Sequence, residues 1–175
     1  MSLLDKFYNC FSNNEARISS GEMSEGVCLD TIKNKAENYY SSGDFYCSEA
    51  IVKTIKDELE LDISESAVAM ASGFPVGIGG AGCLCGALTG GVMILGAVFG
   101  RTKPGHKRVD KTMELSNELH GIFKEKHGCT CCRVLTKGMK LGSKKHMEQC
   151  VFFTGEMAVE TVKIIARETD IELIG

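Results

Sequence analysis

Apolar residues recur at intervals of three and four along most of the chain, which is the spacing of amphipathic helices. Sustained alternation of apolar and polar residues, the pattern of half-buried strands, has little support. The spacing predicts helices over 23–40, 44–59, 64–73, 83–99, 109–127 and 144–169, with a short amphipathic piece at 1–12. Asp44 is the expected N-cap of the second of the long helices. We therefore predict an all-α fold, a single-domain helical bundle.

The middle of the chain departs from the amphipathic pattern, because residues 66–100 include no charged side chain. Within it, 83–99 is apolar on every side, as in the centre of a bundle or a membrane span. At 17 residues, without flanking Trp or Tyr, it is short for a span, so we expect no membrane partner and a central glycine-rich buried helix. We divide the chain into an N-terminal helical extension, 1–43, and a cysteine-rich domain, 44–175.

Charge and cysteine content narrow the classes of function. The 175 residues carry a formal net charge of −3, which gives no electrostatic basis for binding nucleic acid. The first residues lack the basic and apolar regions of a secretory signal, which predicts a cytoplasmic protein. In a reducing cytoplasm, nine cysteines are expected to be metal ligands or redox thiols rather than a disulfide framework.

Most of the cysteines fall at helix ends or beside glycines. The candidate metal ligands are Cys47, Cys83, Cys85, Cys129, Cys131, Cys132 and Cys150, whereas Cys10 and Cys28 lie apart in the N-terminal segments. Two thiolates 4 Å apart repel by about 4 kcal/mol at an effective dielectric of 20, so a converging set is either neutral or held by cations. Iron–sulfur clusters and zinc both satisfy thiolates, and the spacing does not choose between them. A thiol–disulfide protein using the C-x-x-C pair Cys129 and Cys132 is a further alternative.

A glycine loop leads into the central helix. It matches G-x-G-x-x-G formally, but a predicted helix precedes it and no acidic residue follows about 20 positions later, which disfavours a dinucleotide site. We expect Gly79, Gly80, Gly82 and Gly86 to contribute to cofactor binding instead. Glycines let backbone N–H groups approach sulfur closely, which tunes the reduction potential of a cluster.

Cys47, Cys85-Gly-Ala-Leu-Thr-Gly90, Cys132 and Cys150 occur in an order that resembles a family of redox-active proteins defined by four cysteines around C-G-A-x-x-G. The same residues resemble the C-terminal region of split-Soret cytochrome c, and the match covers about 44–165. The resemblance implies a helical domain, a redox role, a homodimer and an iron–sulfur cluster bound by these four cysteines. No C-x-x-C-H motif is present, so no haem is expected. Cys83, Cys129 and Cys131 are additional to the four cysteines of the family pattern, and we treat them as second-tier candidate ligands.

We therefore expect electron transfer or reductive chemistry at a cysteine-ligated cluster. The basic run Arg133, Lys137, Lys140, Lys144 and Lys145 could dock an acidic electron-carrier protein, and a solvated surface explains it equally well. His127 and His146 lie near cysteine segments, and we expect both to be solvated at polar helix ends. Residue patterns for a catalytic triad or paired catalytic carboxylates are not found in the sequence.

Overall fold

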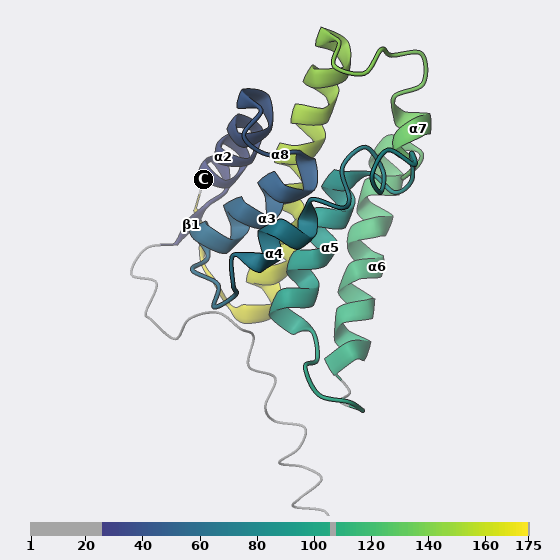
Figure 1. The fold of residues 1–175 in the computed structure, drawn as a ribbon. Coiled ribbons are helices and arrows are strands. Elements are labelled where there is room, and N and C mark those ends of the chain that lie inside the picture. The colour runs from purple at the N-terminus through teal and green to yellow at the C-terminus, as the bar shows by residue number, and fades with distance from the viewer. Residues whose placement is uncertain (1–25, 106–107, 175) are drawn as a thin grey trace, which may run out of the picture.

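The computed structural model describes residues 26–105 and 108–174 as a helical bundle with one two-stranded sheet. Its elements are β1 (Val27–Cys28), α2 (Leu29–Ser42), α3 (Cys47–Glu58), α4 (Ser66–Ala71), α5 (Gly86–Phe99), α6 (Arg108–His127), α7 (Cys132–Leu135), α8 (Lys144–Thr169) and β2 (Leu173–Ile174). Figure 1 shows α8 running along the molecule, with α2 and α6 on its two sides. The all-α fold class is thus confirmed. The predicted piece at 1–12 lies outside the described residues.

The uncharged segment supplies the centre of the bundle, as its composition predicts. Helix α5 packs against α3, α6 and α8, and Leu88, Ile94 and Leu95 on it are almost fully buried. A Cβ at Gly90 would lie 2.9 Å from the backbone oxygen of Ser48 on α3, and one at Gly91 would collide with Thr161 on α8. These glycines therefore let two helices approach α5 closely. Among the described residues, no helix is both long enough and apolar enough to cross a bilayer.

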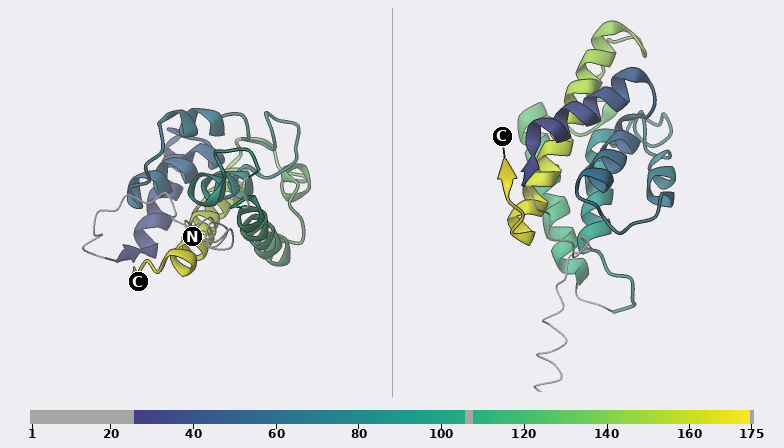
Figure 2. Two further views of the ribbon diagram at one scale, coloured as in Figure 1. Left: turned by 90° about the horizontal axis from the view of Figure 1, so that it is seen from below. Right: turned by 90° about the vertical axis from the view of Figure 1, so that its left-hand side faces the viewer.

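The described part of the predicted N-terminal extension packs into the same core. Ile32 and Ala36 of α2 are fully buried, and α2 lies against α3 and α8. Strand β1 pairs in parallel with β2, with Val27 opposite Leu173. Figure 2 shows the two strands side by side, where the last described residues return to the start of α2. Residues 26–43 therefore share one hydrophobic core with the cysteine-rich part.

Four helices begin later than their sequence patterns predict, and α2 begins at Leu29 rather than at residue 23 because Val27 and Cys28 form β1. Helix α4 begins at Ser66 rather than at residue 64. Helix α5 starts at Gly86 rather than at residue 83, because the Cys85 backbone is not helical (φ −59°, ψ 132°) and its N–H donates to the Thr130 carbonyl at 2.8 Å. Asp44 is not the N-cap of α3, so that prediction was wrong. Tyr46 takes the N-cap position, and its N–H donates to a carboxylate oxygen of Glu49 at 3.0 Å.

Candidate functional site

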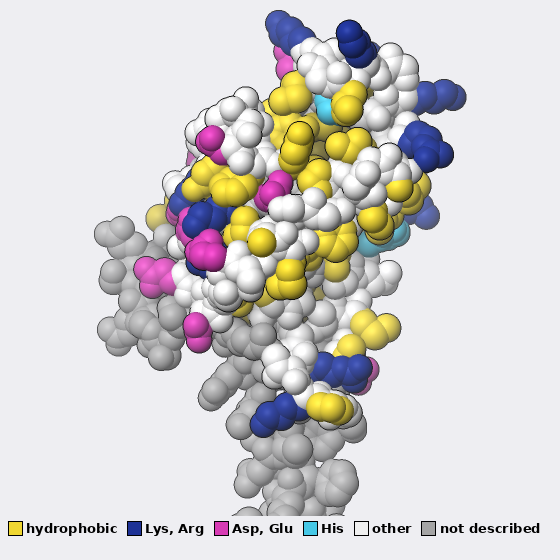
Figure 3. All heavy atoms as spheres, in the orientation of Figure 1, with side chains coloured by type: hydrophobic (Ala, Val, Ile, Leu, Met, Phe, Trp, Pro, Cys, Tyr) yellow, Lys and Arg dark blue, Asp and Glu magenta, His cyan; other side chains and the backbone are white. Residues whose placement is uncertain are grey.

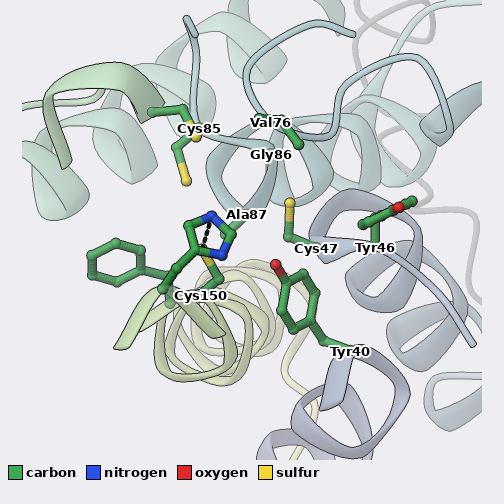
Figure 4. A pocket seen from close by; sticks show the side chains of 11 residues that line it. Tyr40, Tyr46, Cys47, Val76, Cys85, Gly86, Ala87 and Cys150 are labelled. Atoms are coloured by element: carbon green, nitrogen blue, oxygen red, sulfur yellow. Dashed lines mark hydrogen bonds between the residues drawn. The ribbon is translucent and has the colours of Figure 1, made fainter. Parts of the chain in front are cut away.

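Four cysteines from distant parts of the chain meet around one small cavity of about 20 Å³. Cys47 begins α3, Cys85 directly precedes α5, Cys132 begins α7, and Cys150 lies in the second turn of α8. The other residues that line the cavity are Tyr40, Tyr46, Val76, Gly86, Ala87, His146 and Phe153. Figure 4 shows Tyr40, Cys47 and Cys85 reaching from different elements toward the space beside Cys150.

Two helix N-termini and one glycine position the sulfur atoms. Cys47 and Cys85 stand at the N-termini of α3 and α5, where the positive ends of the helix dipoles favour negative charge. A Cβ at Gly86 would collide with the sulfur of Cys47, so this position has room only for glycine while Cys47 points into the cavity. Gly86 therefore lines the cavity.

Burial favours the neutral form of these thiols. Loss of hydration raises the pKa of Cys47, Cys132 and Cys150, and raises the pKa of Cys85 to about 12. The backbone N–H groups of Ala87 and Leu88, in the first turn of α5, oppose the rise of the Cys85 pKa. Without a cation the four groups are therefore thiols at neutral pH, and a soft metal centre would convert them to thiolates.

The polar groups beside the thiols come from two residues that the sequence patterns did not assign to the site. The prediction that His146 is solvated was wrong, because His146 is only 4% exposed and its Nε2 lies 3.7 Å from the sulfur of Cys150. The spacing of four between His146 and Cys150 could have shown that they share a helix face. The Tyr40 hydroxyl offers a hydrogen bond to Cys150. No spacing in the sequence could show this contact, because Tyr40 lies on α2 and Cys150 lies on α8.

The other histidine near a cysteine segment is also not a solvated group. The Nε2 atom of His127 lies 2.6 Å from a carboxylate oxygen of Glu156, and its ring centroid is 4.5 Å from that of Phe153. His127 therefore belongs to an aromatic and hydrogen-bonded contact between α6 and α8, and the prediction for it was wrong as well.

The second-tier cysteines lie outside the cavity. Cys83 is exposed, Cys129 and Cys131 are half-buried, and the sulfur atoms of Cys83 and Cys131 are 2.6 Å apart. Cys132, the expected partner of Cys129 in a thiol pair, faces the cavity instead. Cys28 is half-buried in β1, far along the chain from these segments, and Cys10 lies outside the described residues.

Three of the four glycines expected at a cofactor do not line the cavity. Gly79 and Gly80 are exposed. The N–H of Gly80 donates to the Pro75 carbonyl at 3.3 Å, and that of Gly82 donates to the Gly77 carbonyl at 2.8 Å. The glycine loop thus closes on its own backbone, and the amide groups that favour a thiolate come from the first turn of α5.

The donor set suits a soft metal centre, although the sulfur atoms do not form a ready-made ion site. Four thiols around one buried cavity match the ligand chemistry of iron–sulfur clusters and of zinc. Within 26–105 and 108–174, however, no three His, Cys, Asp or Glu side chains are close enough together to hold a metal ion. Binding at the cavity therefore requires the cysteine side chains to move.

The basic run surrounds the same end of the molecule. Arg133 follows Cys132 on α7, Lys144 and Lys145 open α8 directly before His146, and Lys137 and Lys140 lie between these two helices. All five of these side chains are exposed. Figure 3 shows Lys and Arg gathered around the end where α8 begins, while Asp and Glu are prominent near α2 and α3.

Comparison with known proteins identifies a family. The model of the family described as "Putative redox-active protein (C_GCAxxG_C_C)" matches residues 45–164, a range that includes all four cavity cysteines. No curated protein matches the chain. No solved structure matches it either.

Proposed function

The chain belongs to the C_GCAxxG_C_C family of redox-active proteins, and from that premise we propose that it binds an iron–sulfur cluster through Cys47, Cys85, Cys132 and Cys150. The observation that carries this proposal is the convergence of these four thiols on one buried cavity. The function would be electron transfer, or reductive chemistry at the cluster. When bound, such a cluster exchanges single electrons at a potential set by its surroundings.

The residues around the cavity have identifiable roles in this proposal. Ala87 and Leu88 offer backbone N–H groups to Cys85, and the Tyr40 hydroxyl offers a hydrogen bond to Cys150. Such hydrogen bonds stabilise the thiolate form of a ligand and tune the reduction potential. Phe153 and Val76 on the cavity wall limit the access of water to the sulfur atoms.

Purification without oxygen tests the proposal directly. We expect iron and acid-labile sulfide in equal amounts, together with visible absorption that bleaches on reduction. Cys85→Ser and Cys150→Ser should lose most of the iron, whereas Cys28→Ser should retain it, because Cys28 lies in β1 away from the cavity. Equal loss from all three variants would indicate general destabilisation and contradict the assignment of ligands.

Zinc is the main competing occupant. Zinc satisfies the same four thiolates. A purified protein that is colourless, contains stoichiometric zinc and lacks sulfide would therefore indicate a structural or metal-handling zinc site instead of a cluster. Reconstitution with iron and sulfide after chelation separates a native cluster from metal acquired during expression. Failure of the reconstituted protein to hold sulfide would reject the iron–sulfur proposal.

An acidic electron carrier is the partner that the surface favours. The exposed basic run lies at the end of the bundle where Cys132 and His146 reach the cavity. Complementary charge accelerates encounter, and the effect falls as ionic strength rises. Electron exchange with an acidic carrier should therefore slow with added salt.

The homodimer implied by the family resemblance stays a prediction.

A further inference from the structure

The cysteines that lie outside the cavity form a contact of their own. The sulfur atoms of Cys83 and Cys131 are 2.6 Å apart, although 48 positions separate the two residues. Cys83 is exposed and Cys131 is half-buried, and neither lines the cavity. A small molecule in solution can therefore reach this pair without entering the site of the proposed cluster.

Backbone hydrogen bonds fix the two segments on both sides of the pair. The N–H of Arg133 donates to the Gly82 carbonyl at 2.9 Å, and the N–H of Cys85 donates to the Thr130 carbonyl at 2.8 Å. The Arg133 guanidinium adds a hydrogen bond of 2.6 Å to the Ala81 carbonyl. Gly82 allows this approach, because a Cβ there would lie 2.9 Å from the Arg133 side chain.

The two paired segments carry an outer and an inner pair of thiols. Cys83 and Cys131 meet on the side toward solvent, while Cys85 and Cys132 are 6% and 8% exposed and face the cavity. The Cys131 carbonyl accepts hydrogen bonds from the N–H groups of Val134 and Leu135, which anchors the second segment to α7. The outer sulfur atoms are therefore held together by ordered backbone, which lowers the entropic cost of joining them.

We propose that Cys83 and Cys131 form a second redox centre, a surface dithiol that becomes a disulfide by exchange with external disulfides. The exposed sulfur of Cys83 attacks a disulfide R–S–S–R, which forms a mixed disulfide and releases one R–S⁻. The sulfur of Cys131 then attacks the Cys83 sulfur and releases the second R–S⁻. The two cysteines lose two electrons and two protons, and the external disulfide is reduced to two thiols.

This centre goes beyond the proposed cluster and differs from the thiol pair that the sequence suggests. The C-x-x-C spacing points to Cys129 and Cys132, but Cys132 faces the cavity. A pair that bridges two segments also has a consequence that a C-x-x-C pair lacks. The disulfide would tie 82–85 covalently to 130–133 and thereby lock one wall of the four-cysteine cavity.

The test uses oxidised glutathione as the probe and peptide mass as the readout. The full-length protein is reduced, freed of reductant without oxygen, treated with the probe, quenched with acid, alkylated and digested. A disulfide should join the peptides that contain Cys83 and Cys131 in the wild type and in Cys129→Ser. It should be absent from Cys83→Ser and Cys131→Ser, and Cys131→Ser should accumulate glutathione on Cys83.

Cys129→Ser is the matched control, since Cys129 is half-buried in the same segment and two positions from Cys131. Formation of the cross-link in Cys83→Ser or Cys131→Ser, or its absence from the wild type, would overturn the proposal. Iron content is measured in parallel. Loss of iron from Cys83→Ser and Cys131→Ser would place the pair among the cluster ligands and likewise overturn it. A protein without iron that still forms the cross-link would reject only the proposed cluster.

Discussion

The Nε2 atom of His146 lies 3.7 Å from the sulfur of Cys150, one turn further along α8. The N–H of Gly142 donates to the other ring nitrogen of His146, Nδ1, at 3.4 Å. Because Nδ1 accepts that hydrogen bond, a neutral imidazole carries its proton on Nε2 and directs it at Cys150. His146 is therefore placed to donate to the sulfur of a proposed cluster ligand.

Removal of this donor should lower the reduction potential without removing the metal. A hydrogen bond to a ligand sulfur stabilises the more negative, reduced state of a cluster. We expect His146→Gln to retain iron and to show a more negative midpoint potential in an anaerobic redox titration. His120→Gln is the control, because His120 is on α6 and does not line the cavity. Equal shifts in both variants would contradict this role.

Gly86 and Gly96 on α5 should respond in opposite ways to alanine. The Cβ of Gly86→Ala would collide with the Cys47 sulfur, and overpacking of this kind costs about 1–3 kcal/mol of unfolding free energy. A Cβ at Gly96 meets nothing within 4 Å, so Gly96→Ala should stabilise the helix by up to about 1 kcal/mol. Urea unfolding of both variants measures the difference, and a stabilising Gly86→Ala would show that the cavity lacks the described packing.

Two buried threonines provide a second matched pair. Thr54 and Thr161 are both fully buried, and Thr161 Oγ1 donates to the Met157 carbonyl at 2.7 Å. Thr54 Oγ1 has no hydrogen-bond partner among the described residues. A buried hydroxyl without a partner is destabilising, so Thr54→Val should raise the free energy of unfolding by about 1 kcal/mol. Thr161→Val should lower it by a similar amount. Thermal unfolding measures both variants, and a shift of the two midpoints in the same direction would contradict this prediction.

The metal-free protein should lose stability at alkaline pH. The pKa values of Cys47 and Cys85 are higher in the folded protein than in the unfolded chain, where a thiol titrates near 8.5. Below about pH 8.5 both states keep these protons, so the stabilising contribution is fully present. Above it the unfolded chain ionises first, and stability falls until the pH passes the folded-state pKa.

The slope of this loss identifies its source. Each such thiol lowers the free energy of unfolding by up to about 1.4 kcal/mol for each pH unit in that window. Urea unfolding with reductant and chelator from pH 8 to 10 should therefore show a steeper decline for the wild type than for Cys85→Ala. Parallel declines in the two proteins would mean that Cys85 does not contribute.

The sequence predicts the helical fold because each long helix has a local signal, and the four cysteines that line the cavity also have a signal in the sequence. The uncharged segment marks α5, and the C-G-A-x-x-G motif and the order of the cysteines mark the site. Tertiary contacts decide what was missed. Tyr40 reaches the cavity only because α2 packs against α8, and Cys83 meets Cys131 only because two distant segments pair. Neither contact has a periodicity or spacing that a single sequence could show.

The placement of the outer and inner thiols depends more on the length of the two paired segments than on their composition. The outward and inward thiols are on adjacent residues in Cys131-Cys132, and one residue lies between them in Cys83-Leu84-Cys85. Exposed loops ordinarily tolerate insertions and deletions. Here a single inserted or deleted residue would shift the backbone hydrogen bonds between 82–85 and 130–133, which hold Cys83 beside Cys131 and keep Cys85 and Cys132 at the cavity. Relatives that keep both thiol pairs are therefore expected to keep the positions of Cys131 and Cys132 adjacent and one residue, free to vary, at the position of Leu84.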